Sequence, residues 1–278
     1  MKFGIAMFPA DFAIRPDDLA RAVEARGFES LFFPEHTHFP RNAQTESLAA
    51  YYSHTFDLFV SLAYALQATT RLLVGSGVML APEHDPFNAA KALASLDVLS
   101  GGRLLVGFGA SWIDQELVDH GVDPAWRWTA TVDTIKAIKT IWQNEVAEYH
   151  GTHHNFAEIW SWPKPLRQQG PPVLIGGNGA RVLERVVALG DEWFPEDHQS
   201  VEELGARMAQ LQTLAAEAGR ESIPVSLFAA RPDIERLKQI AALGVHRVVL
   251  YAPPADAATV LAHLDHVAEL RDAVNSRG

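Results

Sequence analysis

The sequence predicts an α/β protein built as a closed (β/α)₈ barrel, and three observations support this fold class. Eight short runs rich in Val, Ile, Leu and Phe alternate with eight segments of helical period. The 278 residues are close to the roughly 250 that are typical of such a barrel. The alternative, a doubly wound open sheet, lacks its main sequence support, because Pro9, Ala10 and Asp11 follow the first run where a Gly-x-Gly-x-x-Gly motif would be expected.

The predicted strands are apolar without strict alternation, which is typical of strands covered on both faces. They occupy residues 2–8, 30–34, 72–80, 104–108, 173–175, 192–195, 225–229 and 247–251. Apolar residues at three- and four-residue spacing predict helices at residues 17–26, 56–68, 88–99, 132–142, 181–189, 201–218, 234–243 and 260–270. This order predicts parallel strands joined by crossover helices.

Two long connections interrupt the alternation. One covers residues 36–55 after the second strand, and the other covers residues 144–172 after the fourth helix. Long loops in a compact domain are usually functional, and the first of these follows a strand, on the side where barrels carry their active sites. No linker or internal repeat divides the chain, so we expect a single domain over residues 1–278.

Composition excludes several classes of function. The 23 Lys and Arg against 34 Asp and Glu give a net charge of −11, which argues against nucleic acid or an anionic membrane as the main partner. The chain has no cysteine, so disulfides, thiolate catalysis and cysteine-ligated metals are excluded. No apolar stretch approaches the roughly 20 residues that cross a bilayer. We therefore expect a soluble, cytoplasmic protein that acts on a small molecule.

The end of the second predicted strand carries the candidate catalytic residue. It reads Pro34-Glu35-His36-Thr37-His38, and His36 is the first imidazole after the strand. Histidine changes charge near neutral pH, which suits it to proton transfer, although loop histidines are often merely solvated. A His-x-His pair could also ligate a metal in a barrel hydrolase, but the other strand ends offer too few ligands. We expect no metal, and we place His38 beside the substrate.

The turn after the fifth predicted strand is a candidate anion site. It runs through Gly176, Gly177, Asn178 and Gly179 into a helix, with Arg181 in the first turn. Glycines allow backbone N–H groups to approach a ligand, and a helix N-terminus favours negative charge. A cation in that first turn is unfavourable for the helix alone, so a bound phosphate would explain it. The alternative is an ordinary tight turn.

Small residues at the ends of strands three and four are consistent with a flat ring bound above the barrel. Gly77 and Val78 lie in the third strand, and Gly109 and Ala110 end the fourth. Glycine inside a strand often marks a bulge or close approach of a ligand. Aromatic residues in the loops indicate an apolar substrate cavity; they are Phe39, Tyr51, Tyr52, Trp112, Trp160 and Trp162.

As a set, these segments resemble the luciferase-like flavin or deazaflavin oxidoreductase family, and in particular its actinobacterial coenzyme F420-dependent branch. The matching segments are 25–31 (ARGFESL), 34–38 (PEHTH), 97–103 (DVLSGGR), 107–112 (GFGASW), 148–151 (EYHG), 162–165 (WPKP), 171–179 (PPVLIGGNG) and 190–193 (GDEW). The resemblance covers residues 1 to about 200 and thins after that.

The resemblance implies a TIM barrel, usually homodimeric, with a cofactor across the carboxyl ends of the strands. It implies a cofactor phosphate on the turn from Gly176 to Gly179 and a non-proline cis peptide at Gly77–Val78 behind the ring. In sugar-phosphate dehydrogenase relatives, a His after strand two and a Glu after strand four serve the reaction. His36 matches the first, whereas Trp112 stands at the second, so sugar-phosphate oxidation is not expected.

The resemblance favours hydride transfer between a small organic substrate and coenzyme F420. FMN-dependent monooxygenation with reduced flavin and oxygen is the alternative. A metal-dependent barrel hydrolase and a non-catalytic cofactor-binding protein are further alternatives. Because F420 carries an acidic tail beyond its phosphate, local cations such as Arg181 and Arg185 would have to offset the negative charge of the protein.

Overall fold

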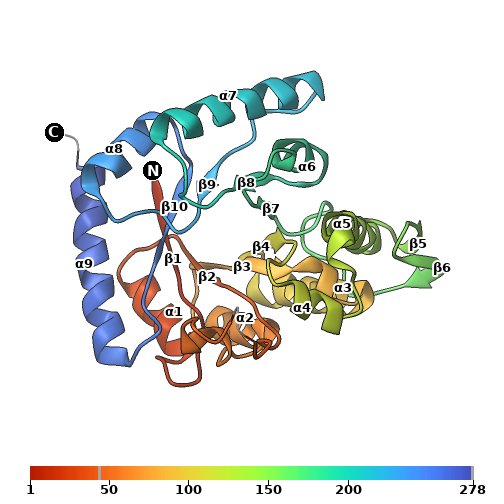
Figure 1. The fold of residues 1–278 in the computed structure, drawn as a ribbon, viewed down its shortest axis with the longest axis horizontal. Coiled ribbons are helices and arrows are strands. Elements are labelled where there is room, and N and C mark those ends of the chain that lie inside the picture. Colours follow the sequence, from red (N-terminus) through yellow and green to blue (C-terminus); the bar gives the residue numbers. More distant parts are fainter. Residues whose placement is uncertain (43–44, 277–278) are drawn as a thin grey trace.

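The computed structural model describes residues 1–42 and 45–276, and its centre is a barrel of eight parallel strands (Figure 1). The barrel strands are β1 (Lys2–Ala6), β2 (Ser30–Phe33), β3 (Leu73–Leu80), β4 (Leu104–Gly109), β7 (Val173–Gly176), β8 (Glu192–Phe194), β9 (Ser226–Leu227) and β10 (Arg247–Tyr251). They pair in the order β8-β7-β4-β3-β2-β1-β10-β9. Every predicted strand is thus confirmed.

Two single bridges complete the ring between the outer strands of this order. Trp193 of β8 pairs in parallel with Val225, just before β9, and Glu196 pairs in parallel with Phe228, just after β9. The predicted barrel is therefore confirmed, and the open doubly wound sheet is excluded.

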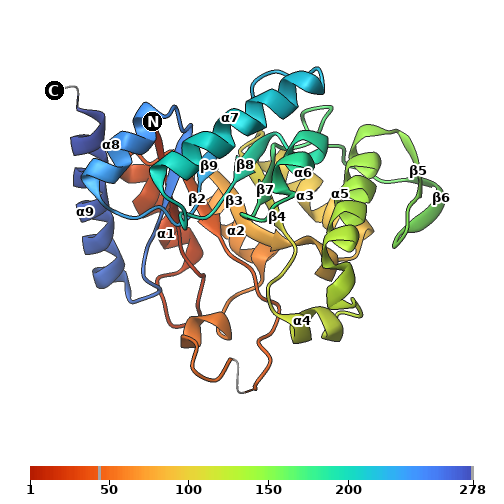
Figure 2. The same ribbon diagram turned by 45° about the horizontal axis from the view of Figure 1, so that its top comes forward.

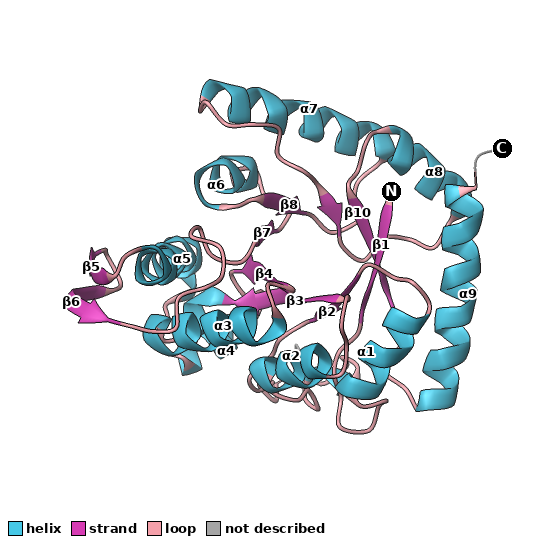
Figure 3. Ribbon diagram, turned by 180° about the vertical axis from the view of Figure 1, so that it is seen from behind, coloured by secondary structure: helices cyan, strands magenta, loops and turns pink. Residues whose placement is uncertain are grey.

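Helices surround the barrel on its outer side (Figures 1 and 3). They are α1 (Pro16–Ala25), α2 (Leu58–Gln67), α3 (Pro86–Ser100), α4 (Asp114–Asp119), α5 (Arg127–Gln143), α6 (Val182–Leu189), α7 (Val201–Glu217), α8 (Ile234–Ala242) and α9 (Ala257–Asn275). Short 3₁₀ helices are η1 (Ala50–Tyr52), η2 (Ala81–Glu83) and η3 (Pro124–Trp126). No helix in the described part of the chain is long and apolar enough to cross a membrane.

Local sequence explains where these helices begin and end. The Asp85 side chain accepts the N–H of Asn88 at the start of α3, and Gly101 adopts the left-handed conformation just after its end. At α7, Ser200 and Glu203 form a reciprocal capping box.

Two apolar cores hold the barrel together. The larger lies between the strands and the helices and includes Ile5, Leu31 and Val106. The smaller fills the barrel interior, with residues Ala6, Phe32, Leu105, Leu174, Phe194, Phe228 and Val249. The interior is therefore packed with side chains, so a ligand would have to lie on the rim of the barrel.

The two insertions differ in structure. The connection after β2 contains η1, and together with α4 it lies at one end of the barrel (Figure 2). The connection after α5 is not a plain loop, because it forms the antiparallel hairpin β5 (Val146–His150) and β6 (Asn155–Trp160). The hairpin projects beyond α5, at the outer edge of the molecule (Figures 1 and 3).

Candidate active site

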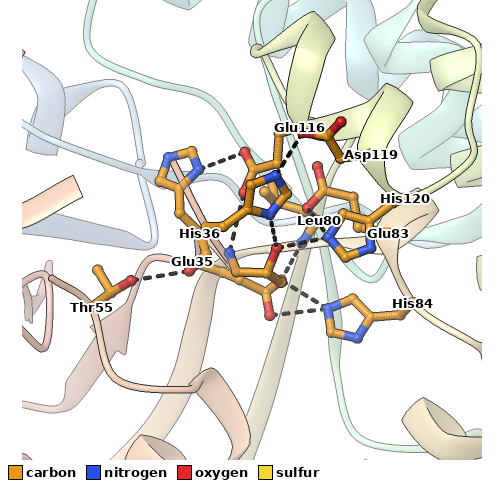
Figure 4. A network of polar contacts seen from close by, with 11 residues as sticks. Glu35, His36, Thr55, Leu80, Glu83, His84, Glu116, Asp119 and His120 are labelled. Atoms are coloured by element: carbon orange, nitrogen blue, oxygen red, sulfur yellow. Dashed lines mark hydrogen bonds and ion pairs between the residues drawn. The ribbon is translucent and has the colours of Figure 1, made fainter. Parts of the chain in front are cut away.

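His36 lies just beyond the end of β2 and is held by a buried carboxylate (Figure 4). Its Nδ1 is 2.8 Å from Oε2 of Glu116, and the two side chains are 3% and 0% exposed. The other oxygen of Glu116 accepts the Thr37 N–H at 3.1 Å, and the Thr55 hydroxyl donates to the His36 carbonyl at 3.0 Å. With Nδ1 engaged by Glu116, Nε2 is the nitrogen left to exchange a proton with a ligand.

Glu116 was missed by the sequence analysis. The resemblance compared only position 112 with the acid of sugar-phosphate dehydrogenases and found Trp112 there. The structure places an acid after β4 all the same, because the short helix α4 carries Glu116 back to His36. A fully buried glutamate in the polar segment Asp114-Gln115-Glu116 gives no periodic signal, so its orientation could only come from the fold.

Aromatic rings surround His36. Phe39, Tyr52 and Trp112 each meet its ring edge-on, with centroids 5.4, 5.5 and 6.0 Å away. Phe8 lies nearly parallel to it at 6.2 Å and contacts Tyr51 at 4.9 Å. Except for Phe8, these are residues expected from the sequence to form an aromatic cavity, and the fold brings them together. Such rings fit an apolar or ring-shaped ligand better than a sugar phosphate.

His38 lies on the more exposed side of this loop, with 41% of its side chain accessible. Its Nε2 is 3.0 Å from Asp119, and its Nδ1 is 3.0 Å from the Thr37 hydroxyl. The ring also lies 5.6 Å from that of His120. These contacts place His38 at the outer rim, next to α4.

A second histidine–carboxylate pair supports the end of β2. Both oxygens of Glu35 lie 2.9–3.0 Å from Nε2 of His84, and one accepts the N–H of Leu80 at 2.7 Å. Burial alone would lower the pKa of His84, but the hydrogen bond and charge of Glu35 outweigh it and raise that pKa. This pair ties the end of β2 to the end of β3.

The peptide Gly77–Val78 is cis, as the resemblance implied. It coincides with a register shift between β3 and β4. The neighbouring glycines make room for the protein itself: a Cβ on Gly109 would lie 2.5 Å from the Val78 side chain, and one on Gly77 would lie 2.8 Å from Phe228. The sequence analysis interpreted these glycines as space for a ring, but their immediate neighbours are internal side chains.

The turn after β7 is held by its carbonyl groups. The indole N–H of Trp193 donates to the carbonyl of Gly177 at 3.1 Å, and Arg207 donates to the carbonyls of Asn178 and Gly179 at 2.7 and 3.1 Å. The Asn178 side chain both donates to and accepts from the backbone of Glu196. The turn is therefore fixed to β8 and α7, and this rigidity suits a preorganised anion site.

The N–H groups of this turn require one correction. The N–H of Gly177 points at the carbonyl of Phe194 at 3.4 Å, so it belongs to the strand ladder and is not free for a phosphate. The N–H groups of Asn178, Gly179, Ala180 and Arg181 lie in the turn just before α6, and among the described residues they have no backbone hydrogen-bond acceptor, so they are the donors that an anion could use. Arg181 is exposed and makes no capping bond.

A basic cavity of about 350 Å³ adjoins this turn, between α5 and α6. Its cationic lining residues are Lys136, Arg181 and Arg185, and Arg185 stacks 4.0 Å above the ring of Trp128. One of its acids, Asp133, is already satisfied by the Tyr149 hydroxyl and the N–H groups of residues 152–154. Glu184 is the other acid of the lining. The cavity therefore has cationic side chains available to an anion.

Trp160 does not join the site, contrary to the sequence analysis. It lies on β6 of the outer hairpin, beyond α5, with 78% of its surface exposed. The error arose because residues 144–172 were interpreted as one loop over the barrel, whereas the pairing of Val146 with Trp160 builds a hairpin on its outside.

Metal binding was the alternative use of the histidines. Among residues 1–42 and 45–276, no group of three or more His, Asp or Glu side chains is arranged to hold a metal ion. His36 and His38 instead bond to the carboxylates of Glu116 and Asp119.

The closed eight-stranded barrel identifies a TIM-barrel protein. Its buried His36–Glu116 pair lies at the carboxyl ends of the strands, where TIM-barrel enzymes carry their active sites. The model of the luciferase-like monooxygenase family matches residues 15–234, and the chain belongs to this family of oxidoreductases and monooxygenases.

Several known proteins resemble the chain. An uncharacterised protein of Mycobacterium tuberculosis is 35% identical over 96% of this chain and 98% of its own length. An FMNH₂-dependent dimethylsulfone monooxygenase of Pseudomonas putida is 27% identical over 78% of this chain and 58% of its own. Among solved structures, monooxygenase RslO1 of Streptomyces bottropensis has a TM-score of 0.83 at 18% identity, covering 97% and 98% of the two chains. An F420-dependent secondary alcohol dehydrogenase has a TM-score of 0.80 at 16% identity, covering 99% of each.

Proposed function

We propose that this protein is an oxidoreductase that transfers a hydride between a small organic substrate and coenzyme F420. The observation that carries the proposal is the buried His36–Glu116 pair, which is ringed by aromatic side chains at the carboxyl end of the barrel. Two-electron oxidation of an alcohol releases one hydride and one proton, so the site needs a residue that accepts the proton. The F420-dependent alcohol dehydrogenase, a neighbour in structure, supports the same class of reaction.

The residues present fit such a cofactor. The open N–H groups of Asn178, Gly179 and Ala180 would hold its phosphate, with Arg181 as a partner, and the bulge at Gly77–Val78, next to Gly109 and Ala110, would lie behind its ring. When bound, the deazaflavin supplies the carbon that accepts or gives the hydride. The protein supplies binding, orientation and the proton path.

His36 is the proposed proton-transfer residue. Its Nε2 would take the proton from a substrate hydroxyl during oxidation, or return it to a carbonyl oxygen during reduction. Glu116 fixes the proton on Nδ1 and balances the positive charge that forms when Nε2 is protonated. Phe39, Tyr52 and Trp112 would exclude water and favour an apolar substrate, with His38 at the outer rim.

The basic cavity beside the turn supports F420 over FMN. Both cofactors end their ribityl chain in a phosphate, but F420 continues into an acidic tail. Lys136, Arg181 and Arg185 lie where a chain leaving the turn toward α5 would pass. These local cations offset a net charge of −11 that would otherwise repel the tail.

FMN-dependent monooxygenation is the second candidate, and a specific observation favours it. The dimethylsulfone monooxygenase that matches this chain uses reduced FMN by its name, and monooxygenase RslO1 has the same fold. The turn after β7 would bind the FMN phosphate, and the aromatic side chains around His36 would bind an apolar substrate.

A side-by-side titration separates these cofactors. We expect F420 to quench the tryptophan fluorescence of the protein at lower concentration than FMN, at one ionic strength. Rising salt should weaken F420 binding more than FMN binding, because its tail adds charge. Tighter binding of FMN, or oxygen consumption with reduced FMN, would establish the monooxygenase instead.

Two variants test the assigned roles. His36→Asn should lower turnover by about 10²–10⁴-fold with little change in cofactor affinity, since a positioned acid or base contributes about that much. Unchanged turnover would mean that His36 has only a structural role. A loss of cofactor affinity as large as the loss of turnover would mean that His36 binds the cofactor.

Arg181→Ala should weaken F420 binding by roughly tenfold, because a charge-assisted hydrogen bond contributes about 1.5–3 kcal/mol. Lys238→Ala removes a cation from the far helix α8 and serves as the charge-matched control. Equal affinity in the two variants would leave the backbone N–H groups as the whole anion site.

A further inference from the structure

Glu83 is a buried carboxyl group that the proposed chemistry does not use. It ends η2, directly after β3, and its side chain is 0% exposed. Neither of its oxygens has a hydrogen-bond partner among the described residues. Its ion-pair contact is Nε2 of His120, 3.8 Å from Oε2, and His120 in turn bonds to the Thr37 hydroxyl at 2.7 Å (Figure 4).

The groups around Glu83 come from every neighbouring element. Glu116 of α4 and Glu35 at the end of β2 carry the same charge as an ionised Glu83, whereas His120 after α4 can carry the opposite charge. Ser111 at the end of β4 presents a hydroxyl that is itself buried and without a hydrogen-bond partner in the described structure. His84 is engaged with Glu35. A charged Glu83 would therefore be buried, without a hydrogen-bond partner among the described residues, and close to two like charges.

Such a group is expected to be a neutral acid at physiological pH. Burial and the charges of Glu116 and Glu35 raise the pKa of Glu83 to about 8, and the Ser111 hydroxyl offsets only part of that rise. A proton on Glu83 thus relieves its electrostatic repulsion with Glu116. Glu116 is the one that bonds to His36.

We propose that Glu83 is a positioning residue for His36: as a neutral acid it leaves Glu116 as the single charge paired with His36, and its ionisation tightens the hold of His36 on a proton. The proposal rests on the proton-transfer role assigned to His36. It adds a second carboxyl group, behind the first, that sets how readily the histidine gives up its proton.

A separate cavity lies beside Glu83, away from the barrel mouth. The cavity, of about 270 Å³, is lined by Glu83, His84, Asp85, His120, His153 and His154, among others. It lies between η2, the end of α4 and the start of β6, whereas the aromatic residues around His36 line none of it. The enclosed Glu83 carboxyl would therefore exchange its proton through the histidines of this cavity, such as His120, and not through the barrel mouth.

A titration of His36 in the cofactor-free protein tests the proposal directly. The ring nitrogen signals of His36, identified by their loss in His36→Asn, should show an inflection near pH 8 in the wild-type protein. Glu83→Gln, which keeps the shape of the neutral acid, should abolish that inflection. Glu148→Gln, an exposed carboxylate of the hairpin, should leave it unchanged. Persistence of the inflection in Glu83→Gln, or its absence in the wild type, would overturn the proposal.

Infrared spectroscopy supplies a second readout. At pH 7 the wild-type protein should show the carbonyl band of a protonated carboxylic acid, which Glu83→Gln lacks and which disappears above about pH 9. If the wild type and Glu83→Gln show no difference in this band at pH 7, Glu83 is ionised and the proposal is refuted. Neither measurement needs a cofactor, so a failure of the F420 assignment would not alter them. If both succeed, kcat of the loaded enzyme should change near pH 8 in the wild type and not in Glu83→Gln.

Discussion

The two ends of the barrel carry buried charges that are balanced in different ways. At the amino-terminal end, Arg247 is 2% exposed and donates to both oxygens of Glu29 at 2.7 and 2.8 Å and to Glu192 at 2.9 Å. At the carboxyl end, Glu35, Glu83 and Glu116 are buried, and their ion-pair partners in the described structure are histidines.

This difference separates a structural end from a chemical one. An arginine is charged at every physiological pH, so the charge balance at the amino-terminal end is fixed. A histidine gains or loses its charge near neutral pH, so the charge at the carboxyl end depends on the proton supply. Barrel enzymes keep their chemistry at that second end and their stability at the first. The expected consequences differ in size and in the sign of their pH dependence.

Breaking the amino-terminal cluster should give the largest effect. Arg247→Ala removes the buried cation that Glu29 and Glu192 share and leaves Glu29 only the half-exposed Lys2, and removal of one partner of a buried ion pair typically costs about 3–5 kcal/mol. We expect urea unfolding to show a loss of this size. Lys238→Ala, which removes the exposed pair with Glu235, should cost less than about 0.5 kcal/mol. Similar losses in the two variants would refute a structural role for the cluster.

Low pH should remove the stabilisation that Glu29 and Arg247 provide. Burial would raise the pKa of Glu29, but its bonds to Arg247 outweigh burial and lower that pKa to about 2. Because the folded-state pKa lies below the usual value near 4.5, the contribution is present above pH 5 and is lost as pH falls toward 2. It amounts to about 3 kcal/mol at neutral pH. The stability difference between wild type and Glu29→Gln should therefore shrink as the pH of the unfolding experiment is lowered from 6 to 3.

At the carboxyl end, the folding stability should depend on pH in the opposite direction and fall as the pH rises. The pKa of Glu83 is raised, to about 8, so the folded state keeps a proton that the unfolded chain loses above about pH 4.5. Wild-type stability is thus penalised progressively as pH rises from about 5 to 8. Glu83→Gln removes the penalty and should stabilise the protein by up to about 4 kcal/mol at pH 8, with little effect at pH 4. A variant that is equally stable or weaker at both pH values would contradict the neutral, unpartnered state of Glu83.

The same contrast explains what the sequence could predict. The eight strands and their order follow from apolar runs and turn residues, which are local signals, and the structure matches them. His36 could be named as a candidate because it lies just after the second predicted strand. Glu116 and Glu83 were not, because each is a single acid in a short element whose burial depends on three other elements.

The hydrogen bonds and side-chain directions at the candidate site were harder to predict than the positions of its turns and strands. The turn from Gly176 to Gly179 lies where the sequence placed it, but the pairing of the Gly177 N–H with Phe194 depends on the register of β7 and β8. Trp160 was misplaced because hairpin pairing within a long connection follows from contacts between β5 and β6, which composition alone does not show.

The smallest expected effect compares two exposed tryptophans, one at the chemical end and one on the outer hairpin. Trp112 is 48% exposed and lies 6.0 Å from His36, whereas Trp160 is 78% exposed on β6. Exposed substitutions of this kind usually change stability by less than about 0.5 kcal/mol, so Trp112→Phe and Trp160→Phe should both unfold like the wild type. Their fluorescence should differ, because the proposed cofactor ring beside His36 would lie near Trp112 and not near Trp160. Trp112→Phe should remove a larger share of the cofactor-dependent quenching than Trp160→Phe, and the reverse result would place the ring away from His36.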